Sequence, residues 1–144
     1  MKPIWIFLVG LMLCGCAVKA DRSMIGGADG PTSVWVETGE KKMYEVITPN
    51  EAKEIMDSEQ VFIILDVRSE EEFNEGHIPG AILIPHEQIK DKAEDILHDK
   101  NIQILVYCRS GRRSKIAAEA LVQLGYTHVK EFGGIIDWPF EIEQ

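Results

Sequence analysis

Short apolar runs alternate with amphipathic stretches along the chain from residue 44 to its end. Five short stretches predict β-strands, because each holds apolar or β-forming residues between polar or turn-forming ones. The five predicted strands are 44–47, 61–65, 81–84, 104–107 and 128–132. The run 104–107 is apolar throughout, without alternation, which is typical of a strand buried on both faces of a parallel sheet.

Helical periodicity fills the intervals between these strands. Thr48–Glu51 and Ser69–Glu72 are capping boxes that each begin a helix, the first with a proline at its first helical position. Further helices are expected at 88–97, 114–124 and 135–143. Alternating strands and helices predict an α/β fold with a central parallel five-stranded sheet, helices on both faces and right-handed crossovers.

The first residues of the chain lack this alternation. Lys2 is followed by an apolar run, Ile4–Leu13, that is too short to span a bilayer and is typical of a secretory signal. The run ends in Leu13-Cys14-Gly15-Cys16, which resembles the lipobox of bacterial lipoproteins. The resemblance implies that the chain is cut before Cys16 and that acyl chains such as palmitate are attached to this cysteine. An ordinary signal peptide or a short anchor is the alternative.

These patterns divide the chain into a signal peptide at 1–15, a lipid-anchored linker at 16–43 and a folded domain at 44–144. The linker contains the breaker-rich segment Gly26–Thr32, which will not form a regular element. Ser33–Val36 is either a short strand that packs on the domain or an apolar patch near the membrane. We therefore expect the protein on the extracytoplasmic side of a bacterial cell membrane.

The candidate chemistry lies at the end of the apolar run 104–107. Cys108 ends this run, and a polar, basic loop with one glycine follows it before the next helix. In open α/β sheets ligands bind at the carboxyl ends of the strands. A loop that enters a helix also presents backbone N–H groups and a partial positive charge. Together with the arginine charges, these groups favour a thiolate and can hold an anion against it, so Cys108 is a candidate nucleophile.

The cysteine count supports a reactive role for Cys108. If Cys14 leaves with the signal and Cys16 is acylated, Cys108 is the only free thiol of the mature protein and no internal disulfide can form. A small buried core cysteine is the simpler alternative, but neither arginine nor glycine is expected beside an inert thiol. The net charge of −9 argues against nucleic acid as a partner. The histidines lack metal-ligand spacing, so no metal is implied.

The stretch Cys108-Arg109-Ser110-Gly111-Arg112-Arg113 resembles the active-site loop of the rhodanese family. Three further stretches are similar to the family's motifs in order and spacing: Leu65–Arg68 with Glu72-Phe73, Gly76–Ala81, and Gly133–Trp138. The resemblance implies a rhodanese-like fold and a sulfurtransferase that needs no cofactor. In such an enzyme Cys108 takes the outer sulfur of an anionic donor such as thiosulfate, carries it as a persulfide and gives it to a thiol or cyanide acceptor.

The resemblance also implies roles for the residues around Cys108. The residues expected to bind the substrate are Arg109, Ser110, Gly111, Arg112 and Arg113, and the last of these is expected to hold the anion. Those expected to support the site are Asp66, Arg68, His77 and Trp138. The resemblance implies that His77 bonds loop backbone rather than acting as a base. From their positions after the strand end, Arg68 and Glu72 are candidates for an ion pair that fixes this loop, an architectural role. Trp138 either walls the pocket or fills the core.

Two other functions fit the loop less well. The related dual-specificity phosphatases have an arginine six positions after the cysteine, where this chain has Ser114, and the shorter loop suits sulfur better than phosphate. A sensing or binding module, whose thiol is oxidised or carries persulfide without turnover, is the other alternative. The expected partners are the small sulfur donor, the acceptor, the membrane through the lipid anchor, and a redox or thiol-carrier protein.

Overall fold

The computed structural model describes residues 34–38 and 42–144, and of residues 34–38 and 42 the backbone alone. The predicted signal peptide, the predicted lipid-attachment residue Cys16 and the segment Gly26–Thr32 lie outside the described residues. The elements, in chain order, are β1 (Val34–Thr38), β2 (Lys42–Val46), α1 (Pro49–Met56), β3 (Phe62–Asp66), α2 (Glu70–Glu75), β4 (Ile82–Leu83), η1 (His86–Gln88), α3 (Ile89–Ile96), β5 (Gln103–Cys108), α4 (Arg112–Gln123), β6 (His128–Gly134) and η2 (Ile135–Asp137). No helix in this part of the chain has the length and apolar content needed to cross a membrane.

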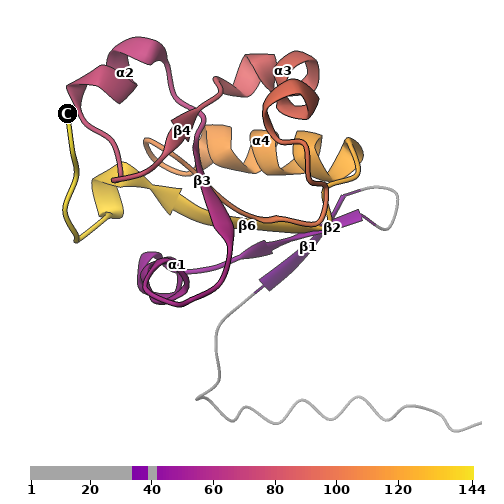
Figure 1. Ribbon diagram of the computed structural model, residues 1–144, viewed down its shortest axis with the longest axis horizontal. Helices are drawn as coiled ribbons and strands as arrows, with labels where there is room; N and C mark the ends of the chain where they lie inside the picture. Colours follow the sequence, from indigo (N-terminus) through magenta and orange to yellow (C-terminus); the bar gives the residue numbers. More distant parts are fainter. Residues whose placement is uncertain (1–33, 39–41) are drawn as a thin grey trace, which may run out of the picture. The chain divides into compact units, whose positions relative to one another are not determined.

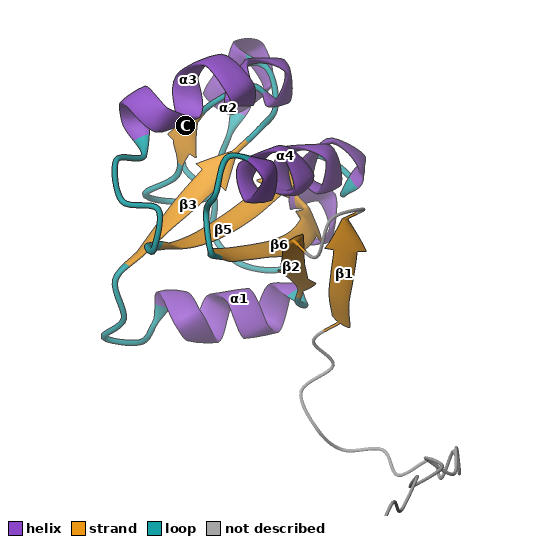
Figure 2. Ribbon diagram, turned by 90° about the vertical axis from the view of Figure 1, so that its right-hand side faces the viewer, coloured by secondary structure: helices purple, strands orange, loops and turns teal. Residues whose placement is uncertain are grey.

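The described strands form a single sheet in the order β1-β2-β6-β5-β3-β4 (Figures 1 and 2). The strands from β2 to β4 run parallel, which confirms the predicted α/β fold with its five-stranded parallel sheet. β5 lies between β6 and β3, so Cys108 is at the carboxyl end of an interior strand.

β1 is an additional edge strand that runs antiparallel to β2. Val34 pairs with Val46 and Thr38 with Lys42, so the sheet begins inside the range 16–43 that the sequence assigned to a linker. The compact unit that holds the described residues accordingly spans Pro31–Gln144. Of the two alternatives for this segment, the structure shows the short strand.

Helices cover both faces of the sheet, as predicted (Figure 2). α3 and α4 pack on one face over a cluster that includes Ile104 and Val106, and α1 packs on the other over a cluster that includes Leu105 and Tyr107. Successive residues of β5 therefore point into opposite hydrophobic clusters. This two-sided burial explains why the run shows no alternation of apolar and polar residues.

The helix predicted at 135–143 is wrong. Only the short 3-10 turn η2 forms, and Trp138 after it has extended backbone angles. Pro139 lacks a backbone N–H and disfavours helical geometry in the residue before it, so a helix cannot continue here. The remaining segment folds back instead, and the backbone N–H groups and carbonyls of His77 and Glu143 form two hydrogen bonds of 2.8 Å.

Candidate active site

Cys108 lies buried at the point where β5 meets the loop that leads into α4. Gly111 is the N-cap of α4, with a φ of 93° that favours glycine. In this conformation the Gly111 N–H donates to the sulfur, with 3.1 Å between N and Sγ. The expected arrangement of strand end, tight loop and helix N-terminus is therefore present.

The surroundings of Cys108 favour the thiolate. Burial raises the pKa of the thiol, but hydrogen bonds from the Ser114 side chain and from the backbone N–H groups of Ser114, Ser110 and Gly111 lower it by more. The net pKa is below the ordinary value for cysteine. A thiolate held by several donors is what a nucleophilic cysteine requires.

The loop can take this shape because the residue of β6 that lies beside it, Gly134, has no side chain. A Cβ on Gly134 would lie 2.1 Å from the carbonyl oxygen of Arg109 and 2.6 Å from the Cα of Ser110. The pairing of β5 with β6 shifts after Val106, which sets Cys108 beside Gly134. The Gly-Gly motif thus makes room for the loop that carries the cysteine.

Arg113, in the first turn of α4, is bound to α2. Its two terminal nitrogens donate to the Glu72 carboxylate at 2.6 and 2.8 Å. This hydrogen bond lowers the pKa of Glu72 to about 2 and raises that of Arg113, to which the charge of the Cys108 thiolate also contributes. Arg113 thus lies near the thiolate while its guanidinium is held by a carboxylate. Arg109, Ser110 and Arg112 are exposed.

The ion pair expected between Arg68 and Glu72 is wrong, because Arg68 pairs with Asp66. The guanidinium donates to the Asp66 carboxylate at 2.7 to 3.0 Å and to the Gly76 carbonyl at 2.7 Å, and both side chains are buried. This pair ties the end of β3 to the loop after α2, which is an architectural role.

His77 has structural contacts. Its ring stacks on Phe73 with 3.7 Å between centroids, and Nδ1 lies 3.0 Å from the Phe73 carbonyl oxygen. On the other side Nε2 lies 3.3 Å from a carboxylate oxygen of Glu143. The imidazole therefore bonds backbone and the C-terminal segment, in keeping with the expectation that it is not the base for Cys108.

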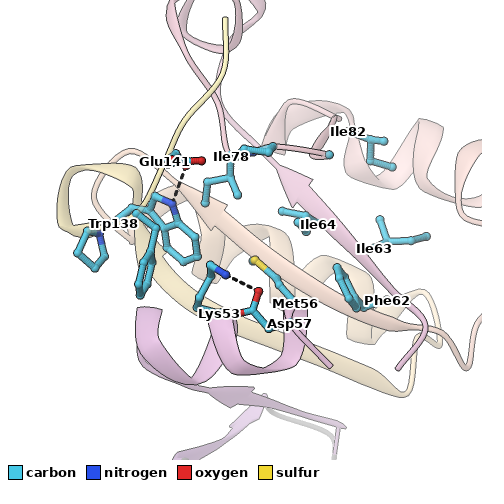
Figure 3. Close-up of a pocket in the computed structure, with 14 residues that line it drawn as sticks. Lys53, Met56, Asp57, Phe62, Ile63, Ile64, Ile78, Ile82, Trp138 and Glu141 are labelled. Atoms are coloured by element: carbon cyan, nitrogen blue, oxygen red, sulfur yellow. Dashed lines mark hydrogen bonds and ion pairs between the residues drawn. The ribbon is translucent and has the colours of Figure 1, made fainter. Parts of the chain in front are cut away.

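Trp138 belongs to the α1 face of the sheet. It packs against Phe132 and Phe140, with 5.6 and 4.9 Å between ring centroids, and its Nε1 donates to the Glu141 carbonyl at 3.2 Å. It also lines an open groove of about 1060 Å³ between α1 and β3, which Cys108 does not line (Figure 3). Trp138 therefore fills the core and lines this groove, which is separate from the Cys108 loop.

Two residues that the sequence analysis did not assign complete the site. The Ser114 hydroxyl lies 3.6 Å from Cys108 Sγ and 2.5 Å from Oε1 of Glu131, which also accepts a hydrogen bond from the Gly133 N–H at 2.9 Å. Both side chains are buried. The signal available in the sequence is a carboxylate next to Phe132 in the predicted strand before the Gly-Gly motif, since a carboxylate that is buried there needs hydrogen-bond donors.

Residues 48–139 match the family described as Rhodanese-like domain. The chain belongs to the rhodanese-like family. Among the relatives of this rhodanese-like domain is "Thiosulfate sulfurtransferase PspE" of Escherichia coli, 42% identical over 73 residues, or 51% of this chain and 70% of the relative. A "Sulfurtransferase" of Allochromatium vinosum is 35% identical over 65% of this chain and 86% of its own length. A "Putative sulfur carrier protein YrkF" of Bacillus subtilis is 36% identical, and the match covers 63% of this chain and 49% of the relative.

Solved structures of rhodanese-like domains share this fold. A rhodanese with anions from Escherichia coli is 38% identical with a TM-score of 0.54, over 57% of this chain and 96% of that one. A rhodanese-like domain protein of Staphylococcus aureus is 34% identical with a TM-score of 0.61, over 68% of this chain and 95% of that one. The matched residues include the Cys108 loop and all the parallel strands except β2, and the relatives' names support a role of the sulfurtransferase family.

Proposed function

We propose that this rhodanese-like protein is a sulfurtransferase that moves a sulfane sulfur from an anionic donor such as thiosulfate to a thiophilic acceptor through a persulfide on Cys108. The main support is the ring of donors around Sγ, including the Gly111 N–H at 3.1 Å, which lowers the pKa of the thiol. The sulfurtransferase names of the relatives point the same way.

In the first step the Cys108 thiolate attacks the outer sulfur of thiosulfate. A bond forms between Sγ and that sulfur, the bond between the two sulfurs of thiosulfate breaks, and sulfite leaves with its electron pair. In the second step the acceptor takes the terminal sulfur and Cys108 leaves as a thiolate. A lowered thiol pKa serves both steps, because it supplies thiolate for the attack and makes Sγ a better leaving group.

The loop's part in this reaction is electrostatic. The backbone N–H groups stabilise negative charge at the sulfur, and the three arginines add positive charge to one place in a chain of net charge −9. Arg113 is oriented by Glu72, so its guanidinium needs little reordering when an anionic donor arrives.

Mass spectrometry of the purified protein tests this function. Incubation with thiosulfate should add the mass of one sulfur, and cyanide should then remove it. Cys108→Ser should show no gain, because a hydroxyl is a poor nucleophile toward sulfur, while the nearly isosteric change should leave the fold intact. If the wild-type protein does not gain the mass of one sulfur, sulfur transfer is contradicted. If it forms a persulfide that neither cyanide nor thiols remove, the sensing module is favoured.

We further propose that acyl chains on Cys16 hold the protein at the extracytoplasmic side of a bacterial cell membrane. The lipobox-like stretch Leu13–Cys16 after a short apolar run supports this location. Two acyl chains on one cysteine are enough for stable anchoring. A redox or thiol-carrier protein at the same surface is then a suitable acceptor.

A further inference from the structure

The Ser114 hydroxyl is surrounded by more hydrogen-bond acceptors than it can donate to. Its Oγ lies 2.5 Å from Glu131 Oε1, 3.0 Å from the Gly111 carbonyl oxygen, 3.4 Å from that of Gly133 and 3.6 Å from Cys108 Sγ. A serine hydroxyl donates a single hydrogen bond and accepts two. These acceptors therefore compete for one proton.

The two strongest competitors are the carboxylate of Glu131 and the thiolate of Cys108. Both residues are about 1% exposed, and in such surroundings hydrogen bonds to charged groups are short and strong. The distance of 2.5 Å to Glu131 is typical of a hydroxyl that donates to a carboxylate. When the proton points to Glu131, Ser114 offers only lone pairs to the sulfur, and these can bond a thiol S–H but not a thiolate.

We propose that Glu131 is a positioning residue that controls Cys108 through Ser114. Ser114 donates to Glu131 while Sγ is neutral and turns to Sγ when the sulfur becomes a thiolate. The proton stays on the Ser114 oxygen throughout, and only the acceptor changes. Glu131 keeps the hydrogen bond from the Gly133 N–H at 2.9 Å in both arrangements, so its carboxylate is never without a donor.

The role of this change of acceptor in catalysis rests on the proposed sulfur transfer. Sγ carries charge before the attack on the donor and again when it leaves, but it is neutral while it is bonded to the transferred sulfur. A hydroxyl that turns toward Sγ as charge appears assists the departure of the thiolate, and Glu131 makes the turn reversible. Two further ion pairs lie near the site, Arg113 with Glu72 and Asp66 with Arg68. Arg109 and Arg112 of the loop are also charged, and both are exposed. Tyr44 of β2 also faces this region, with a pKa raised by burial and by the charges of Glu119 and Glu131.

The pH dependence of Cys108 alkylation by iodoacetamide tests the proposal on the full chain, followed at the peptide that contains Cys108. Glu131→Gln keeps the side chain's shape and an acceptor for Gly133 but loses the charge that attracts the Ser114 proton. We expect the titration midpoint to move down by about one pH unit. Below the midpoint the rate should rise about threefold, because more thiolate is present but each thiolate is less nucleophilic. Ser114→Ala, which removes the donor, should move the midpoint up.

The double variant and a matched control separate the route through Ser114 from a general charge effect. In the Ser114→Ala background, Glu131→Gln should move the midpoint much less than it does alone. Glu45→Gln removes another buried carboxylate, on β2 and paired with Lys130, and should leave the midpoint unchanged. Equal shifts in both backgrounds, or no shift in Glu131→Gln, would overturn the proposal. Alkylation of Cys108 does not depend on sulfur transfer. If the midpoints shift as expected but thiosulfate forms no persulfide, the proposed function is overturned and the role of Glu131 stands.

Discussion

Two of the arginines near Cys108 are fixed by carboxylates from another turn or element. Arg113 is held by Glu72 of α2, and Arg68 by Asp66 at the end of β3. Fixed charges act on a reacting group without first being reordered, which is how preorganised sites stabilise developing charge. Arg113, whose charge acts on the thiolate, is thus positioned before any donor binds.

Arg113→Ala should lower kcat/KM for thiosulfate by about 10- to 100-fold, the size expected for a lost hydrogen bond to a charged group. Two effects add, because the cation disappears and Glu72 is left unpaired near an anionic substrate. Steady-state kinetics with thiosulfate and cyanide measure the change. Arg112→Ala, an exposed arginine on the same turn, is the matched control and should lose much less. An unchanged Arg113→Ala enzyme would show that the guanidinium only ties α4 to α2.

The sequence predicted the site's residues better than their pairings. The Cys108–Arg113 loop is contiguous, so its chemistry can be read locally. Arg68 and Glu72 have the spacing of a helical ion pair, but Arg68 precedes the N-cap Ser69 and the spacing rule does not hold outside a helix. The meeting of Ser114 with Glu131 depends on how α4 packs against β6 and on the shifted pairing of β5 and β6, which no local pattern encodes.

Between elements, the Glu72–Arg113 pair links α2 to α4, and Glu72 also closes the capping box of α2. The hydrogen bond from Arg113 lowers the pKa of Glu72 from its ordinary value of 4.5 to about 2 in the folded protein. A carboxylate whose folded pKa is lowered stabilises the fold above its unfolded pKa, and this contribution disappears as pH falls toward the folded pKa. The link is therefore sensitive to acid.

Glu72→Gln should be less stable than the wild type by about 1–2 kcal/mol at pH 6, since a charge-assisted hydrogen bond at a partly exposed site is lost. At pH 3 the difference should shrink, because the wild-type carboxylate gains protons in the unfolded chain. Urea unfolding at the two pH values measures both differences. Glu70→Gln, an exposed glutamate of the same helix, should behave like the wild type. Equal differences at both pH values would contradict the acid sensitivity.

Gly134→Ala should lower the free energy of unfolding by about 3 kcal/mol, because its Cβ would collide with backbone atoms of the Arg109 loop. Gly125→Ala is the control. At that position φ is 96° and nothing lies within 4 Å of the added Cβ, so only the backbone cost of about 1–2 kcal/mol applies. Urea unfolding compares the two variants. If they are equally stable, the loop moves away from β6 at little cost.

The regular elements were predictable wherever one local signal decided them. Capping boxes begin α1 and α2 as predicted, and continuous apolar runs mark the interior strands β3 and β5. The sequence does not decide on β1, because an edge strand pairs on one side only and no local pattern shows whether a partner strand is available. The helix predicted at 135–143 does not form, because Pro139 disfavours helical geometry in Trp138 and has no N–H to donate.

The whole protein combines a net negative charge with a basic loop after Cys108. A net charge of −9 repels anions at long range, so an anionic donor is attracted only near the arginines. The sheet order places Cys108 between β6 and β3, where the loop is supported on both sides. Substrate access is therefore expected from the carboxyl edge of the sheet.

If Cys16 carries the acyl chains as proposed, Cys16→Ser should release most of the protein from the membrane fraction or leave it uncleaved, because the attachment residue is missing. Fractionation and the mass of the mature protein measure retention and processing. Cys14→Ser is the matched control, since a small residue at that position still fits the lipobox. Equal retention and normal processing of the Cys16→Ser protein would refute lipid attachment at this cysteine.

The C-terminal residues return to the loop after α2 (Figure 1). Glu143 forms two backbone hydrogen bonds with His77, its carboxylate accepts from the Gly80 N–H at 3.1 Å, and the Gln144 side chain donates to the Glu75 carbonyl at 3.2 Å. A purification tag fused directly to Gln144 would therefore pull on the helix that carries Glu72. Kinetic constants measured on such a fusion would then include the effect of the tag on α2. A flexible spacer between Gln144 and the tag avoids this.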